Sequence, residues 1–192
     1  MSAAAVAEGI DVNGSKPSHL IRFMRNRSGS TAIEFAVLAI PFSLLVFAIL
    51  ESCIAFAGQQ VLANAADEVA RQLRTGQEKA AGFTEDKLKN KICEKLAVLV
   101  SKDCKAQLIV DLRSYPTFAE AAKVKLKLTS DRDVDTTGFA VTPGPSMSKN
   151  MLQVIYKWPV ITDFMRASMS NLKDGKTLQY ATVTWQNEPF ND

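Results

Sequence analysis

The stretch of sequence that decides the fold is Ala32–Ala57, AIEFAVLAIPFSLLVFAILESCIAFA, in which Glu34 and Glu51 are the only charged residues. A helix of about 20 apolar residues crosses the hydrocarbon core of a bilayer. This stretch is long enough to do so, and it lacks the polar stripe expected of a helix packed at the edge of a soluble core. A core helix is the alternative interpretation. We predict a membrane-spanning helix.

Positive charge is concentrated ahead of this helix, on Lys16, Arg22, Arg25 and Arg27, and the next cation along the chain is Arg71. Flanks rich in Lys and Arg stay in the cytoplasm. We therefore expect a cytoplasmic N-terminus and an exported part over residues 58–192. The single histidine, His19, lies in the leader, so the exported part has no histidine for acid–base or metal chemistry.

The composition of the whole chain excludes several classes of protein. Its 192 residues include 23 Lys+Arg and 20 Asp+Glu, and a net charge of +3 is too small to indicate a nucleic-acid partner. A structural zinc site is not expected, because its four ligands would use all three cysteines and the single histidine. The acidic set Asp111, Asp131, Asp133 and Asp135 lacks the glycine and terminal glutamate of a calcium loop. No catalytic motif is found, so we expect no enzyme activity and no cofactor.

The start of the apolar helix carries a second pattern. The run Arg25–Phe35, RNRSGSTAIEF, resembles a prepilin processing site, with a basic leader, Gly29, and then an apolar helix. If the Gly29–Ser30 bond is cut, Glu34 is the fifth residue of the mature chain and Phe35 is the aromatic residue after it. This resemblance implies that an aspartic prepilin peptidase removes the leader and leaves the helix in place.

An acidic group inside an apolar span is costly and usually has a partner. The resemblance implies that the new α-amino group of Ser30 on one subunit neutralises Glu34 of its neighbour; otherwise Glu34 reaches the headgroups of its own leaflet. Pro41 removes a helix hydrogen bond to the carbonyl of Val37, so a kink is expected there. Glu51 lies near the outer headgroups, or else contacts a partner pilin.

The exported half begins with a continuation of the first helix. Apolar residues recur at helical spacing up to Leu73, and Gly76 suits the helix stop, so we predict one helix from about Thr31 to Arg74. A second helix is predicted over Thr84–Leu99, with Thr84 as N-cap. Strands are predicted at Gln107–Arg113, Met151–Val160 and Thr177–Trp185, with a short edge strand at Val124–Leu128. The segment 129–150, rich in Pro and Gly near its end, is predicted to be a flexible loop.

Cys93 and Cys104 both lie in the exported half, where an oxidising compartment permits a disulfide. Closing a loop of this size stabilises a fold by about 3 kcal/mol in the chain-entropy model. Two buried thiols are the alternative. Cys53 lies in the apolar helix and is expected only to pack there, and Trp158 and Trp185 are expected to fill the core.

The stretch STAIEFAVLAIPFSLLVFAILESCIAF with the following VLANAADEVARQLRTGQ resembles the TadE-like family, the minor pilins or pseudopilins of the Tad (tight adherence) secretion system. The shared features are the IEFA start, Pro41, the mid-span Glu51 and the small-residue helix ending at Gly76, over residues 25–76. This resemblance implies four partners besides the inner membrane: a prepilin peptidase, a Flp-type major pilin, a TadF-like companion subunit and the Tad membrane platform.

Together these patterns predict an α+β protein in which a single-pass N-terminal transmembrane helix extends into a pilin-like spine. The expected parts are a leader (1–29), a membrane helix (30–57), its periplasmic extension (58–76) and a periplasmic domain of helix and antiparallel sheet (77–192). We expect a membrane-anchored minor pilin or pseudopilin of the inner membrane. The alternatives are an uncut periplasmic assembly factor and a soluble binding protein released by signal peptidase at Ala55-Phe56-Ala57, after Ala57.

Overall fold

The computed structural model describes residues 30–100 and 103–191. The leader, with Gly29 and His19, lies outside the described residues. The chain divides into two compact units, one up to Leu45 and one from Val46 onward. The long helix α2 (Ser30–Arg74) contributes its first part to the first unit and its second part to the second unit.

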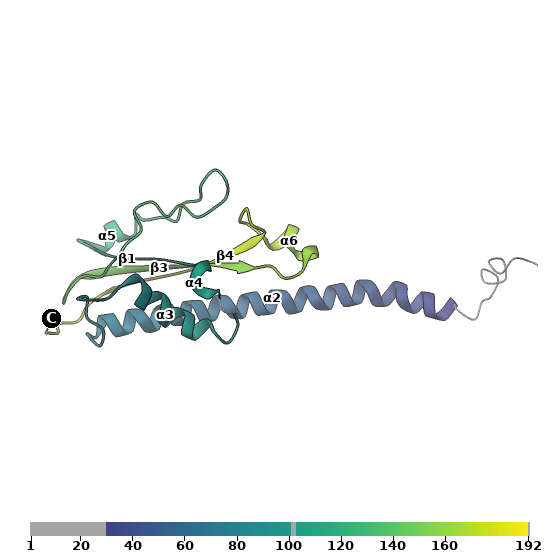
Figure 1. Cartoon of the computed structure of the whole chain (residues 1–192), viewed down its shortest axis with the longest axis horizontal. Coiled ribbons are helices and arrows are strands. Elements are labelled where there is room, and N and C mark those ends of the chain that lie inside the picture. Colours follow the sequence, from purple (N-terminus) through teal and green to yellow (C-terminus); the bar gives the residue numbers. More distant parts are fainter. Residues whose placement is uncertain (1–29, 101–102, 192) are drawn as a thin grey trace, which may run out of the picture. The chain divides into compact units, whose positions relative to one another are not determined.

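The second unit combines the C-terminal part of α2 with short helices and one sheet (Figure 1). The helices are α3 (Glu85–Leu96), α4 (Cys104–Gln107), α5 (Phe118–Ala121) and α6 (Asp163–Met169). The strands are β1 (Leu108–Tyr115), β2 (Val141–Thr142), β3 (Lys149–Pro159) and β4 (Lys176–Gln186). This confirms the predicted α+β class, the long first helix, the second helix and the three main strands.

The sheet has the strand order β2-β1-β3-β4. Antiparallel pairing joins β1 to β3, with Val110 opposite Val154, and joins β3 to β4, with Val154 opposite Ala181. The two-residue strand β2 pairs with β1 in the parallel direction. The three long strands form the expected antiparallel sheet, and β2 makes the sheet mixed at this edge, because the segment that supplies β2 returns along β1 in the same direction.

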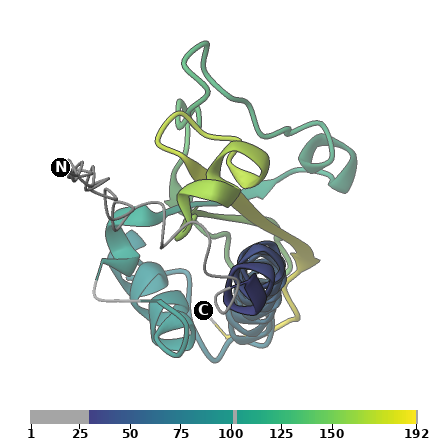
Figure 2. The same ribbon diagram turned by 90° about the vertical axis from the view of Figure 1, so that its right-hand side faces the viewer.

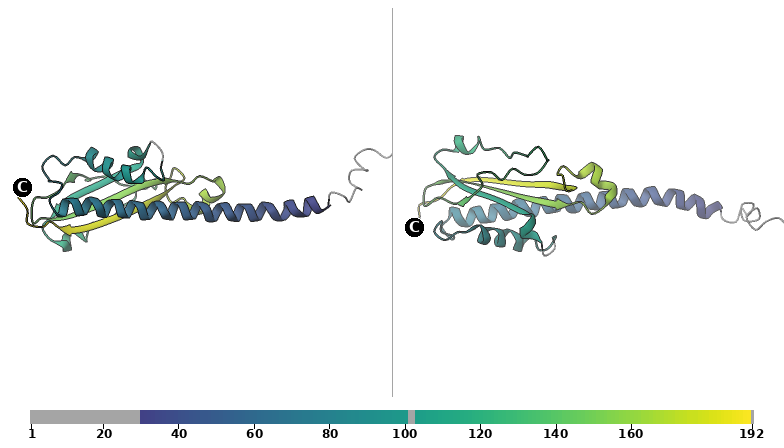
Figure 3. Two further views of the ribbon diagram at one scale, coloured as in Figure 1. Left: turned by 90° about the horizontal axis from the view of Figure 1, so that it is seen from below. Right: turned by 45° about the horizontal axis from the view of Figure 1, so that its top comes forward.

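The core lies between the sheet and the helices α2 and α3, which cover the same face of it (Figure 2). Alternate residues of the central strands point into this core because successive side chains of a strand face opposite sides. The buried cluster includes Leu62, Leu73, Leu88, Ile92, Leu108, Val110, Leu112, Leu152, Val154, Trp158 and Trp185. The C-terminal part of α2 runs lengthwise along the sheet (Figure 3). Both tryptophans thus fill the core, as predicted.

The ends of the two main helices follow the sequence signals. Gly76, after the end of α2, has a φ of 71°, the left-handed conformation that a helix stop requires and that glycine adopts without strain. Thr84 caps α3, and its side chain accepts a hydrogen bond from the Lys87 N–H at 3.3 Å. Glu78, in the connection between the helices, pairs with Lys87 at 2.5 Å and with Lys91 at 2.9 Å.

One predicted strand is absent from the described residues. Val124–Leu128 alternates like a strand, but it forms only an isolated bridge between Leu128 and Val134. Alternation gives a segment one apolar face, yet a strand also needs a neighbouring strand to pair with, and none lies beside this segment. The segment 129–150, predicted to be a loop, contains β2 and the first residues of β3.

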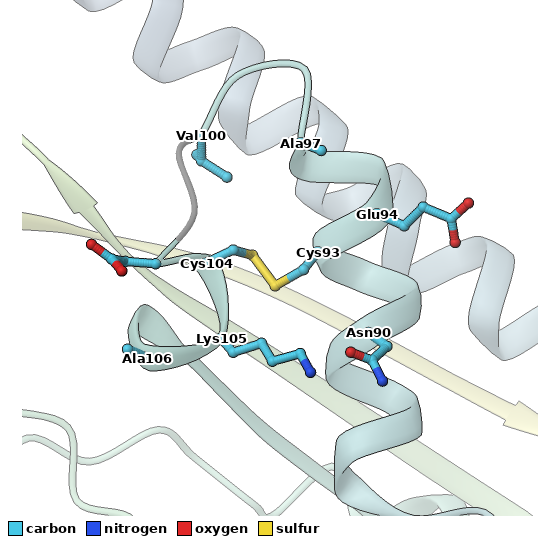
Figure 4. A pocket seen from close by; sticks show the side chains of 9 residues that line it. Asn90, Cys93, Glu94, Ala97, Val100, Cys104, Lys105 and Ala106 are labelled. Carbon is cyan, nitrogen blue, oxygen red and sulfur yellow. A yellow bond between two sulfur atoms is a disulfide. The ribbon is translucent and has the colours of Figure 1, made fainter.

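A disulfide joins Cys93 of α3 to Cys104 of α4, with the two Cα atoms 5.8 Å apart (Figure 4). It fixes the C-terminal part of α3 to the short helix that leads directly into β1. The bridge therefore ties the helical layer to the sheet at the point where the chain crosses from one to the other.

Candidate functional site

The first candidate site is the exposed apolar surface of α2. Between Thr31 and Leu50 no side chain is buried, and the aromatic residues Phe35, Phe42 and Phe47 are 73%, 65% and 59% exposed. Among the described residues, α2 is the one helix long and apolar enough to cross a membrane. No described residue buries the apolar part of this helix, whereas the core helix of a soluble domain is mostly buried.

The two predicted assembly residues and the predicted kink residue lie on this exposed part. Glu34 and Phe35 follow Ser30, the first residue of α2, and both side chains are exposed. Pro41 lies inside the helix, which continues through it. The kink at Pro41 and the cleavage between Gly29 and Ser30 stay predictions.

The structure gives Glu51 a role that the sequence did not predict. Its side chain is only 6% exposed, and its carboxylate binds the segment between β3 and α6. The carboxylate accepts hydrogen bonds from the N–H of Ile161 at 2.5 Å, from the N–H of Thr162 at 3.3 Å and from the Thr162 hydroxyl. Glu51 is therefore an anchor that joins α2 to the sheet domain, in addition to any contact with headgroups or a second subunit.

Two glutamines continue this junction along the helix. The side chain of Gln59 donates to the carbonyl of Tyr180 at 2.8 Å and accepts from the N–H of Tyr180 at 3.2 Å. In return, the Gln179 amide of β4 donates to the carbonyl of Ala55 at 2.8 Å. Because β4 is an edge strand, the two bonds of Gln59 satisfy main-chain groups of Tyr180 that no further strand pairs with.

Between these polar contacts, Gly58 allows the helix and the sheet to approach closely. A Cβ atom on Gly58 would lie within 3.0 Å of three atoms of the Trp158 ring. Any larger residue would push α2 away from β3, or displace a tryptophan that is only 3% exposed. An isolated glycine within a helical pattern commonly marks a position of close packing. Gly58 is therefore the signal in the sequence for this contact.

Two of the four carboxylates considered for calcium, those of Asp111 and Asp133, are held in other contacts. Asp111 is 1% exposed; it accepts hydrogen bonds from Arg113 at 2.7 Å and from the Ala140 N–H at 3.0 Å. Asp133 pairs with Lys157 at 2.6 Å and Lys173 at 3.4 Å. The hydrogen bond from Lys157 lowers the pKa of Asp133 to about 2, although burial acts in the opposite direction. Within residues 30–100 and 103–191, no group of three or more His, Cys, Asp or Glu residues could hold a metal ion.

Most of α2 is similar to a known protein family. Residues 29–71 match the family model described as TadE-like protein. This segment is TadE-like. The match confirms the resemblance over the helix and covers less than half of the chain. No curated protein and no solved structure matches.

The TadE-like segment contains both the exposed part of α2 and the junction with the sheet domain. Glu34, Phe35 and Pro41 lie in the exposed part, whereas Glu51, Gly58 and Gln59 hold the sheet domain. The TadE-like family suggests involvement with the Tad pilus, and it is not a family of enzymes. The apolar helix also suggests a membrane anchor.

Proposed function

We propose that this chain is a membrane-anchored minor pilin or pseudopilin required to assemble a Tad pilus and its secretion apparatus. The observation that carries the proposal is the TadE-like match at residues 29–71, which coincides with a helix whose apolar surface is exposed over Thr31–Leu50. A surface of this kind suits lipid before assembly and the helices of other pilin subunits afterwards.

In this proposal a prepilin peptidase cuts between Gly29 and Ser30 on the cytoplasmic side of the inner membrane. The new α-amino group of one subunit then neutralises Glu34 of its neighbour and sets the register between their helices. The partners are the Flp-type major pilin, a TadF-like companion subunit and the Tad membrane platform. The sheet domain is exported and presents a contact surface.

The junction argues against release of a soluble protein by a cut after Ala57. Such a cut would remove Glu51 and Ala55, which accept hydrogen bonds from the segment after β3 and from Gln179. The buried carboxylate would be lost and its main-chain donors would be left without their acceptor, which costs stability. The folded domain therefore favours a mature chain that keeps its apolar helix.

N-terminal sequencing of the mature protein from its native host tests the proposal. A chain that begins at Ser30 is expected. An intact leader would favour a permanently uncut assembly factor, and a chain that begins at Gly58 would contradict both.

A second experiment tests the register role of Glu34. We expect Glu34→Gln to leave cleavage intact and to prevent incorporation into pili, because an uncharged amide cannot neutralise the α-amino group of a neighbour. Glu94→Gln, at an exposed position of α3, is the matched control. Normal incorporation of the Glu34 variant, measured by immunoblotting of sheared pili, would contradict this role.

A further inference from the structure

The region around α6 exposes large apolar side chains that the sheet domain does not use. Ile161 is 70% exposed and Phe164 is 62% exposed. Ile161 directly precedes α6, and Phe164 lies in its first turn. The two side chains lie close together in sequence, and neither contributes to the buried core. They form an apolar surface that no other part of the sheet domain covers.

The position of this surface along α2 is fixed by hydrogen bonds. The Glu51 carboxylate binds the N–H groups of Ile161 and Thr162, at 2.5 Å and 3.3 Å. One residue further along α2, the Ser52 hydroxyl lies 3.9 Å from the sulfur of Met169, at the other end of α6. Both ends of α6 are therefore held at the turn of α2 that contains Glu51 and Ser52.

This turn contains the first buried residue of α2, and beyond it the helix still exposes the apolar side chains of Ile54 and Phe56, at 43% and 67%. Just before it, Phe47, Ile49 and Leu50 are 59%, 53% and 52% exposed, whereas Glu51 itself is buried. A span of about 20 apolar residues that starts at Thr31 ends at Leu50, which matches the thickness of a bilayer core. If the helix spans the membrane, the bilayer surface lies at the level of α6.

We propose that α6 and the residue before it form a second membrane contact, in which Ile161 and Phe164 insert into the leaflet from which α2 emerges. The occupant is lipid because the main chain of Ile161 is bonded to Glu51, the residue that directly follows the exposed apolar residues of the span. A hollow beside α6 is lined by the cations Arg132, Arg166 and Lys173 and by the anions Asp163 and Asp174. These charges nearly balance, so the apolar side chains carry the contact. This inference rests on the membrane anchor of the proposed function.

Spin labelling of the full chain in lipid nanodiscs tests this contact. In a Cys53→Ser background the disulfide leaves no other free cysteine among the described residues, so one label can be placed at a time. Phe164→Cys reports on α6. Phe118→Cys is the matched control, because Phe118 is an exposed aromatic residue (44%) on α5, at the opposite end of the sheet domain from α6 (Figure 1). Leu44→Cys reports on the span.

The readout is the accessibility of each label to oxygen, which concentrates in lipid, and to a water-soluble nickel complex. In nanodiscs of zwitterionic phosphatidylcholine with one copy per disc, we expect the oxygen-to-nickel ratio at position 164 to exceed that at 118 several-fold and to approach that at 44. A water-like ratio at 164 with a lipid-like ratio at 44 would overturn the α6 contact and leave the anchor intact. Low access to both reagents at 164 would also overturn it, in favour of a protein contact. A water-like ratio at 44 would overturn the anchor and this inference together.

Discussion

The Glu51 carboxylate joins two parts of the chain that are 110 residues apart in sequence. Hydrogen bonds to a charged group each contribute about 1.5–3 kcal/mol. We expect Glu51→Ala to lower the free energy of unfolding by at least the contribution of one such bond, because the main-chain donors of Ile161 and Thr162 lose their acceptor. Urea unfolding in detergent micelles, followed by the fluorescence of Trp158 and Trp185, measures this. Glu94→Ala is the control on an exposed glutamate, and equal midpoints for the two variants would contradict the role of Glu51.

Asp133 gives the sheet domain a dependence on acid pH. The pKa of Asp133 is lowered to about 2, and the hydrogen bond from Lys157 is the largest cause of this shift. The folded state therefore favours the charged carboxylate more strongly than the unfolded state does. Its stabilisation is complete above about pH 4 and is lost as the pH falls towards 2. We expect Asp133→Asn to cost about 1–2 kcal/mol at pH 7 and to flatten this part of the stability profile.

Thermal unfolding of this variant between pH 7 and pH 2 provides the measurement. Asp131→Asn is the matched control, because Asp131 is an exposed residue of the same turn. If the wild-type protein and the Asp133 variant lose stability in parallel as the pH falls, the ion pairs of Asp133 do not contribute to folding.

Among the elements, the connection between α3 and β1 depends on a covalent bond. The disulfide joins two residues separated by 11 positions, and a loop of this size corresponds to about 3 kcal/mol in the chain-entropy model. We expect the double variant Cys93→Ala with Cys104→Ala to lose about that much stability in urea unfolding. Cys53→Ala, which removes the exposed free cysteine, should leave the midpoint unchanged. A double variant as stable as the wild-type protein would contradict a stabilising role for the bridge.

The long elements could be predicted from the sequence because their signals are local. The apolar run and Gly76 define α2, Thr84 marks the start of α3, and the alternation of Leu108, Val110 and Leu112 predicts β1. Short elements such as β2 and α6 have no such period, because they exist only through contacts with distant segments. Val124–Leu128 shows the converse case, in which a good alternation finds no partner strand.

As with the fold, only the part of the candidate site that depends on local sequence could be predicted. The exposed apolar part of α2 follows from composition alone. The junction does not, because the partners of Glu51, Gly58 and Gln59 come from β3, β4 and the segment before α6. The cost of an acidic group in an apolar run indicates that Glu51 has a partner, but it does not identify which one.

At the scale of the whole molecule, one apolar stretch decides where the protein resides. A charged residue at the centre of a membrane helix costs about 2.5–3.5 kcal/mol on insertion scales. We therefore expect Leu44→Arg to shift the chain from the carbonate-resistant membrane fraction to the soluble fraction. Leu128→Arg is the matched control, since Leu128 is similarly exposed (48% against 42%) but lies in the sheet domain. Equal membrane retention of the two variants would contradict anchoring by α2.

The contacts of Glu51, Ala55, Gly58 and Gln59 follow one another along α2, beside strands that run lengthwise with the helix (Figure 3). This arrangement has a mechanical consequence. A tensile force applied along the helix axis loads these contacts in shear and in parallel, whereas a force across the axis would break them one by one. The helix can thus transmit a pull to the sheet domain without being peeled from it, a property that suits the proposed role of a pilus subunit.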